Sequence, residues 1–295
     1  MELITLKDCR NVYREILQGH SYVEGEGIYV KHFREADLGF IDYIYKRCES
    51  DLLKRGVFSS AEKLSLLNKE GYWTEDDENA YYQVVASVKD AYEFQRRLQN
   101  VEQRKMFQKT IDEQEEKLKK IQEERYKLVE PTVESYCNKK INEEYVRKAL
   151  YKDKELEKPL HTQEEFDNVS YADLAILVKL YNDCMNKFNE ENMKKVCVNN
   201  FFLNSFMMTD NDPVKFFGCS VLELTIYQLN LFSRGKYYKF ILEEGNNPPD
   251  SVSEMAEKEG VDHLVSYYDL EYNRIKMERE RKISQMKAQN SKGRR

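Results

Sequence analysis

The chain has 295 residues and a formal net charge of −6; 41% of its residues are hydrophobic and 34% are charged. It is long enough to bury a core, and its charge favours long solvated helices over a single compact globule. Only 11 Gly and 5 Pro are present. An all-β sandwich or barrel needs many tight turns, so this scarcity argues against that class and predicts a mainly α protein.

The six cysteines are widely spaced, and no two of them form a CxxC pair. No zinc knuckle or dithiol motif is therefore indicated, and the spacing is typical of buried free thiols in a reducing compartment. The N-terminal sequence MELITLKDCR contains an acidic residue at its second position and has no apolar core, so we expect no signal peptide. The longest apolar-rich run, Val221–Leu231, is too short and too polar to span a bilayer.

We expect the N-terminal region to contain the only β structure. A short helix is predicted over residues 7–17, followed by a β-hairpin in GHSYVEGEGIYVKHF, where two β-favouring runs flank Gly25 and Gly27. Apolar residues at steps of three and four then predict an amphipathic helix over residues 35–55.

Two capping boxes mark the next helix starts. Ser59 stands three residues before Glu62, and Gly71 ends the short helix that follows. Thr74 and Asp77 have the same spacing at the start of a much longer helical region. Acidic residues beside the only Trp of the chain raise a metal or sugar site as an alternative. Capping already accounts for them, and the spacing lacks the ligand pattern of a calcium loop.

The long region forms a charged arm with coiled-coil spacing. No Gly or Pro occurs from residue 80 to residue 130. The seam of the second half comprises Ile111, Gln114, Leu118, Ile121, Arg125 and Leu128, and that of the first half Phe94, Leu98 and Val101. A reversal within residues 100–109 would pair the halves as an antiparallel helical hairpin. One continuous helix that pairs with another molecule is the alternative, and Pro131 ends the arm in either case.

Shorter helices are predicted after Pro131. Thr162 stands three residues before Glu165 at one helix start, and Ser170 caps a helix whose apolar stripe we expect to lie in the core. The stripe comprises Leu174, Leu177, Val178, Tyr181, Met185 and Phe188. The apolar run FFLNSFMM, residues 201–208, then ends at the turn-forming sequence TDNDP.

Residues 216–249, FFGCSVLELTIYQLNLFSRGKYYKFILEEGNNPP, form the most hydrophobic stretch of the chain. Ser220 and Glu223 are spaced as a capping box that begins a helix, and Gly245 followed by NNPP ends it. Its apolar residues occupy more than one face, so a central core helix and a subunit-facing surface are the two interpretations. Gly235 predicts a close crossing with another backbone.

The sequence contains no recognisable catalytic motif. Its four histidines lie far apart, and no GxGxxG, P-loop or GxSxG sequence is present. We therefore predict no catalytic, cofactor-binding or metal-binding residue and a protein that is not an enzyme.

Residues 273–295 carry nine Lys or Arg and two Glu, a net charge of +7, which leaves −13 on the rest of the chain. This basic tail is a solvated helix or a nucleic-acid-binding segment, with Arg279, Arg281, Lys282 and Lys287 as candidate contacts.

Several segments resemble proteins encoded among the tail genes of contractile-tailed bacteriophages. The resemblance covers about residues 25–255 and rests on IYVKHF, SSAEKLSLLNKEGYWTEDDE, ALYKDKELEKPLHTQEEFDNV and, most specifically, FFG followed by LTIYQ and GKYYK. It implies a role in tail or baseplate assembly, chaperone-like or structural. The implied partners are other tail or baseplate proteins, and the implied location is the host cytoplasm during assembly or the virion. It transfers no catalytic residue.

Taken together, the sequence predicts a helical body with a long charged helical-hairpin arm and a small N-terminal β-hairpin. The predicted segments are residues 1–75, the arm at 76–130, the C-terminal body at 131–265 and the basic tail at 266–295. We expect function through protein–protein contacts, homo-oligomer formation included, without a cofactor or a membrane; nucleic-acid association through the tail is the alternative. The candidate protein-binding residues are Phe216, Phe217, Leu224, Tyr227, Leu231, Phe232, Tyr237 and Tyr238.

Overall fold

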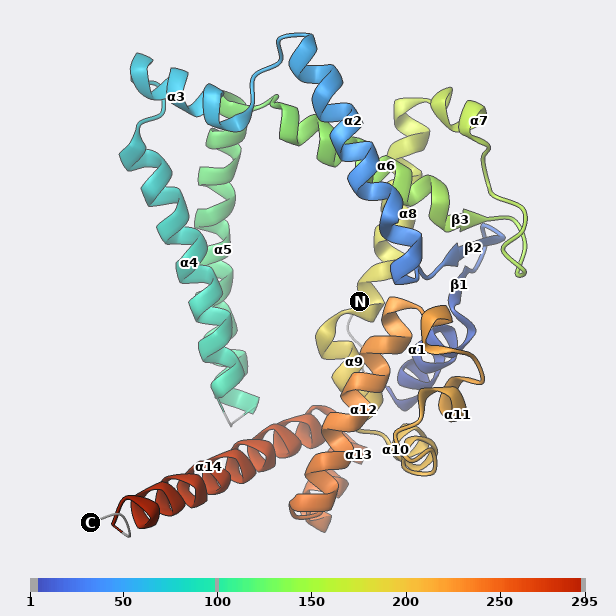
Figure 1. Ribbon diagram of the computed structural model, residues 1–295, viewed down its shortest axis with the longest axis vertical. Coiled ribbons are helices and arrows are strands. Elements are labelled where there is room, and N and C mark those ends of the chain that lie inside the picture. The colour runs from blue at the N-terminus through green and yellow to red at the C-terminus, as the bar shows by residue number, and fades with distance from the viewer. Residues whose placement is uncertain (1–4, 99–100, 293–295) are drawn as a thin grey trace. The chain divides into compact units, whose positions relative to one another are not determined.

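The computed structural model describes residues 5–98 and 101–292, and the chain is mainly α, as its composition predicts (Figure 1). It divides into two compact units. Unit 1 joins Met1–Leu38 to Val146–Arg295, and unit 2 is Gly39–Tyr145. Each unit has a hydrophobic cluster of its own. The segment boundary predicted at residue 75 falls inside unit 2.

The N-terminal part of unit 1 forms as predicted and gains a strand. Helix α1 (Leu6–Gln18) starts with a capping box between Thr5 and Asp8 and ends at Gly19, which has φ 72°. Strands β1 (His20–Val23) and β2 (Ile28–Lys31) pair as an antiparallel hairpin, with His20 opposite Lys31. A short strand from far along the chain, β3 (Leu150–Tyr151), pairs with β2 and completes a three-stranded sheet.

The rest of unit 1 is helical. Its helices are α7 (Gln163–Asp167), α8 (Tyr171–Met185), η2 (Asn186–Phe188), α9 (Glu190–Cys197), α10 (Asn200–Met207), α11 (Pro213–Phe217), η3 (Val221–Glu223), α12 (Ile226–Glu244), α13 (Asp250–Glu259) and α14 (Asp262–Lys292). Thr162 and Ser170 cap α7 and α8, which confirms both predicted starts. The Ser220–Glu223 box exists but begins η3, whereas α12 starts later at its own box between Thr225 and Gln228. The predicted start at Ser220 is wrong because the extended Leu224, at ψ 139°, separates the two elements.

Helix α12 is the centre of the unit 1 core. It packs against α1, α9, α10 and α14, so it is covered on more than one face. Leu231, Tyr238 and Ile241 are completely buried on it. The predicted close crossing at Gly235 with another backbone is wrong: a Cβ at this position would lie 2.5 Å from the aromatic ring of Phe206. The missing side chain therefore makes room for a ring, not for a chain crossing.

The apolar stripe of α8 is less buried than predicted. Phe188, just beyond the helix in η2, is buried. The five stripe residues on the helix itself, from Leu174 to Met185, are only partly buried. Ile176, on another face of α8, is largely exposed. A stripe with the helical period predicts the buried side of a helix, but it does not predict how completely that side is covered.

Unit 2 consists of helices that carry the arm. They are α2 (Phe40–Lys54), preceded by η1 (Glu35–Gly39), α3 (Ser60–Glu70), α4 (Glu75–Arg97), α5 (Val101–Val129) and α6 (Val133–Ala149). Capping boxes at Ser59 and Thr74 confirm two predicted helix starts, and Gly71 ends α3 in the left-handed conformation. Leu67, Trp73 and Val129 form a buried cluster where α3 meets the base of the arm.

Helices α4 and α5 lie side by side as an antiparallel hairpin, which confirms the predicted arm (Figure 1). Helix α4 ends at Arg97 and α5 begins at Val101, so α5 already covers most of the range predicted for the reversal. The Arg104 Nε donates to the Leu98 carbonyl at 2.7 Å, and Gln95 donates to the Arg104 carbonyl at 3.0 Å. The first of these bonds satisfies a carbonyl group at the C-terminal end of α4.

The seam of the arm follows the prediction on α5 and follows it in part on α4. Ile111 is completely buried, and the other predicted α5 positions are partly buried. On α4 Phe94 is 52% exposed but packs on Phe107 of α5, with 5.0 Å between the ring centroids, and the seam also includes the buried Val88 and Ala91, which were not predicted. The side chain of Val101 lies outside the described ones. The heptad on α4 is hard to read because its seam includes Gln95, which donates to Gln108 across the seam at 2.8 Å.

Candidate protein-contact surfaces

Four of the eight predicted protein-binding residues are core residues. Leu224, Leu231, Phe232 and Tyr238 are buried in unit 1. Burial raises the pKa of the Tyr238 hydroxyl well above its ordinary value. In this conformation these four side chains offer no surface to a partner. The hydrophobicity of the 216–249 stretch is therefore explained largely by the intramolecular core.

The other four residues are partly exposed at the edges of that core. Phe216 lies with its ring centroid 5.6 Å from that of the buried Phe206, and Phe217 packs on Phe216 at 4.7 Å. The Tyr227 hydroxyl donates to Met185 Sδ at 3.4 Å. Tyr237, on α12, donates its hydroxyl to Asp269 at 3.3 Å. Of these four residues, Phe216 and Phe217 thus contact each other, and the two tyrosines lie later in the chain, on α12.

The segment that contains this phenylalanine pair carries the most exposed apolar side chains of the body. Leu222 is 88% exposed and Met208 is 84% exposed; Val214 and Val221 are about half exposed. We call this stretch the 208–222 segment. The sequence does not identify these four residues as a contact surface, because a helix that began at Ser220 would carry Leu222 on one of its faces.

Local sequence explains why the 208–222 segment cannot bury its apolar side chains. Asp210 and Asn211 adopt positive φ values of 53° and 61° in the turn after α10, and Pro213 starts α11. Gly218, with φ 75°, ends α11 after a single turn. A chain broken into such short helices has no continuous face to lay on the core. The turn sequence TDNDP and Gly218 were the signals that could have identified it.

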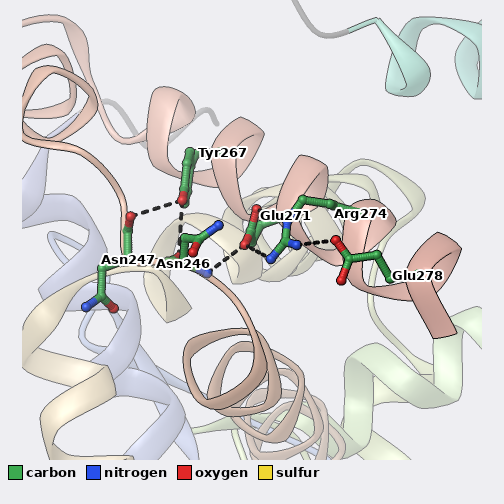
Figure 2. A network of polar contacts seen from close by, with 6 residues as sticks. All are labelled: Asn246, Asn247, Tyr267, Glu271, Arg274 and Glu278. Carbon is green, nitrogen blue, oxygen red and sulfur yellow. Dashed lines mark hydrogen bonds and ion pairs between the residues drawn. The ribbon is translucent and has the colours of Figure 1, made fainter.

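The basic residues of α14 stand on a helix that is tied to the α12–α13 connection. Figure 2 shows the network: the Asn246 backbone N–H donates to the buried Glu271 at 2.6 Å, and Arg274 donates to the same carboxylate at 2.6 and 3.0 Å. The Tyr267 hydroxyl donates to the carbonyls of Asn246 and Asn247. Hydrogen bonds from the Arg274 guanidinium hold the pKa of Glu271 below its ordinary value. The carboxylate is therefore charged at neutral pH.

The four predicted nucleic-acid contacts differ in their surroundings. The Arg279 guanidinium lies 3.1 Å from Glu244 and 4.6 Å from the Phe240 ring centroid, so it is engaged within unit 1. Arg281 and Lys282 are exposed. Lys287 is helical, but its side chain lies outside the described ones. Of these four residues, Arg281 and Lys282 therefore remain as candidate contacts among the described side chains of α14.

Two surface clefts in unit 1 have the size of ligand pockets. A cleft of about 670 Å³ lies between α1, α10, α13 and α14, with Arg10, Phe201 and Leu264 among its lining. Another, of about 450 Å³, lies between the β-hairpin and α8 and includes Tyr22 and Ile176. Both mix apolar and charged side chains.

His32 is a buried core residue. His32 lies against Phe188 and Tyr227, and its Nε2 is 2.9 Å from the Ser21 hydroxyl. Burial lowers the pKa of His32 to about 3, so the ring is neutral at neutral pH. Within residues 5–98 and 101–292, no three His, Cys, Asp or Glu side chains are grouped so that they could hold a metal ion.

Comparison with known proteins leaves the chain without an assigned family. No family model matches it, and neither a curated protein nor a solved structure is similar to it. In the part of the chain that the structure describes, every helix is too short or too polar to cross a membrane.

Proposed function

We propose that the protein is a non-enzymatic assembly protein that works through protein–protein contacts, with the 208–222 segment as its principal docking surface. One observation carries the proposal: Leu222 and Met208 are more than four-fifths exposed beside the partly exposed pair Phe216 and Phe217. Single exposed apolar residues are ordinary on protein surfaces, but several large ones gathered in one short segment are typical of a contact site.

The arm supports the same interpretation. Polar pairs join the two helices across its seam: Glu78 accepts two hydrogen bonds from Arg125, and Ser87 donates to Gln114 at 3.3 Å. Such pairs fix the register of a coiled coil at some cost in stability. A fixed, highly charged hairpin suits a protein that spans or positions partners.

The biological setting follows from the resemblance to bacteriophage tail-cluster proteins alone. This resemblance implies that the partners are tail or baseplate proteins and that the chain acts in the host cytoplasm during assembly or in the virion. The contact proposal itself stands on the exposed side chains and is independent of that setting.

Substitution of the docking surface tests the proposal. The chain with Met208→Ser and Leu222→Ser, tagged at its natural locus, should lose the proteins that co-purify with the unchanged chain while keeping its unfolding midpoint, because both side chains are exposed. Met255→Ser on α13, which changes a methionine that is 48% exposed and lies outside the segment, is the control and should retain them. Unchanged co-purification with the double variant would refute the docking surface. If partners are lost but none is a tail or baseplate protein, only the phage setting is refuted.

A second candidate function rests on α14. From residue 281 to residue 292 the helix carries Arg281, Lys282, Lys287 and Lys292 and no acidic residue. Counterion release predicts that log affinity for DNA or RNA falls steeply with log salt, and that removing residues 281–295 abolishes binding. Equal binding by the full and shortened chains, measured by fluorescence anisotropy with a labelled oligonucleotide, would exclude this function.

A further inference from the structure

Two thiols far apart in the sequence meet inside unit 2. Cys48 lies on α2 and Cys137 on α6, and both are free. The Cys137 Sγ is 3.9 Å from the carbonyl oxygen of Tyr45, which is one helical turn before Cys48 on α2. Cys48 lies close enough to act on the same thiol, and its side chain is one of the causes that raise the pKa of Cys137.

The two thiols differ in access. Cys137 is completely buried, whereas Cys48 is partly exposed. A reagent in solution can therefore reach the sulfur of Cys48 first, and Cys137 is placed to act only on what becomes attached to Cys48. An accessible thiol next to a resolving thiol is an arrangement often found at redox-sensitive cysteines.

We propose that Cys48 and Cys137 form an oxidation site, at which a low-molecular-weight disulfide converts the two thiols into an intramolecular disulfide. In the first step the Cys48 thiolate attacks one sulfur of the small disulfide, a mixed disulfide forms, and one small thiolate leaves. In the second step the Cys137 thiolate attacks the Cys48 sulfur, and the second small thiolate leaves. The protein loses two protons and two electrons, and the small disulfide becomes two thiols.

The second step limits the rate near neutral pH. Burial, together with the contact to Cys48, raises the pKa of Cys137 to about 12. Glu49 on α2 and Glu134 on α6 act in the same direction, because a nearby negative charge disfavours a thiolate. The thiolate of Cys137 is therefore scarce, and disulfide closure should accelerate as pH rises towards alkaline values.

The disulfide would link α2 to α6, the two helices that flank the arm. The closed loop, residues 49–136, contains α3, α4 and α5. A disulfide that closes a long loop removes many conformations from the unfolded chain, so it raises the resistance of the native state to denaturant. This consequence concerns unit 2 and does not depend on the proposed function.

The test uses the purified full-length chain and oxidised glutathione. Peptide mapping of the oxidised wild type should give a linked Cys48–Cys137 peptide, and intact mass should show the loss of two hydrogen atoms with no glutathione attached. The urea midpoint reported by Trp73, the only tryptophan and a unit 2 residue, should rise on oxidation and return on reduction.

Variants separate the roles of the two thiols. Cys137→Ser, or Cys137→Ala if that variant does not fold, should stop at a stable glutathione adduct on Cys48. Cys48→Ser should give no linked peptide. Cys219→Ser, which removes a partly exposed thiol of unit 1, is the matched control and should oxidise like the wild type. Glutathione adducts without the linked peptide in the wild type, or linkage only between molecules, would overturn the proposal.

Discussion

Adding one methyl group at Gly235 should destabilise unit 1, although alanine is the better helix former. The Cβ would lie 2.5, 2.6 and 2.8 Å from three carbon atoms of the Phe206 ring, whereas ordinary contacts begin at 3.4 Å. The ring has little room to retreat: Phe206 is completely buried, and the ring centroids of Phe202, Phe216 and Phe232 lie 5.6, 5.6 and 5.2 Å away.

The magnitude follows from two opposing effects. Overpacking of a closed core costs about 1–3 kcal/mol, and three contacts this short place Gly235→Ala near the upper end. Replacement of glycine by alanine inside a helix contributes about 1 kcal/mol in the opposite direction. We therefore expect a net loss of about 1–2 kcal/mol in the free energy of unfolding, measured from urea denaturation followed by far-UV circular dichroism.

Two further variants check the cause of this loss. Ser233→Ala changes an exposed position of the same helix and should be neutral or slightly stabilising. Phe206→Leu removes the obstructing ring, so Gly235→Ala should cost much less in that background than in the wild type, a coupling of about 1 kcal/mol or more. If Gly235→Ala stabilises the wild type as a free helical site would, the packing argument at Gly235 is refuted.

Other predictions concern the arm and the α14 network. Leu118 and Ile121 are partly buried, so the double variant Leu118→Ser and Ile121→Ser should cost less than the ~2 kcal/mol or more that each fully buried aliphatic side chain contributes, and it should destabilise the arm without changing the oligomeric state; dissociation of an oligomer in sedimentation would show that the seam pairs between chains. Glu78→Ala removes the acceptor of the Trp73 indole N–H and of Arg125, so Trp73 emission should shift and the arm should unfold at lower urea; an unchanged spectrum and midpoint would exclude a structural role for Glu78. The pKa of Glu271 is lower in the folded chain than in the unfolded chain, so its stabilisation is complete above about pH 5 and is lost as pH falls through the folded pKa. Glu271→Gln should flatten that acid dependence, and an unaltered pH profile of the unfolding midpoint would contradict it.

Local chemistry made much of the secondary structure predictable. The side chains that begin α3, α4 and α7 satisfy backbone N–H groups a few residues away, so Ser59, Thr74 and Thr162 could be identified without tertiary information. The start of α12 was misplaced because two capping boxes follow each other closely, at Ser220 and Thr225, and only the second leads into a long helix.

Features that depend on packing were harder to predict. Hydrophobicity correctly indicated that α12 is covered on several faces, but it could not separate Leu231, which is buried, from Leu222, which is exposed. The contact between Cys48 and Cys137 leaves no trace in sequence spacing, since it arises only when α2 packs near α6. The α4 seam could be predicted only in part, because it includes the polar Gln95 and the small Ala91 as well as Phe94.

Site-specific photo-crosslinking tests the central claim most directly. A photoreactive amino acid at position 222, in the chain expressed at its natural locus, should form a covalent adduct with a defined partner protein, and the same amino acid at position 255 should not. Mass spectrometry identifies the adduct. A defined partner captured only from position 222 is the result that the contact proposal predicts. The absence of any adduct at positions 208 and 222, in cells where the protein is functional, would contradict it.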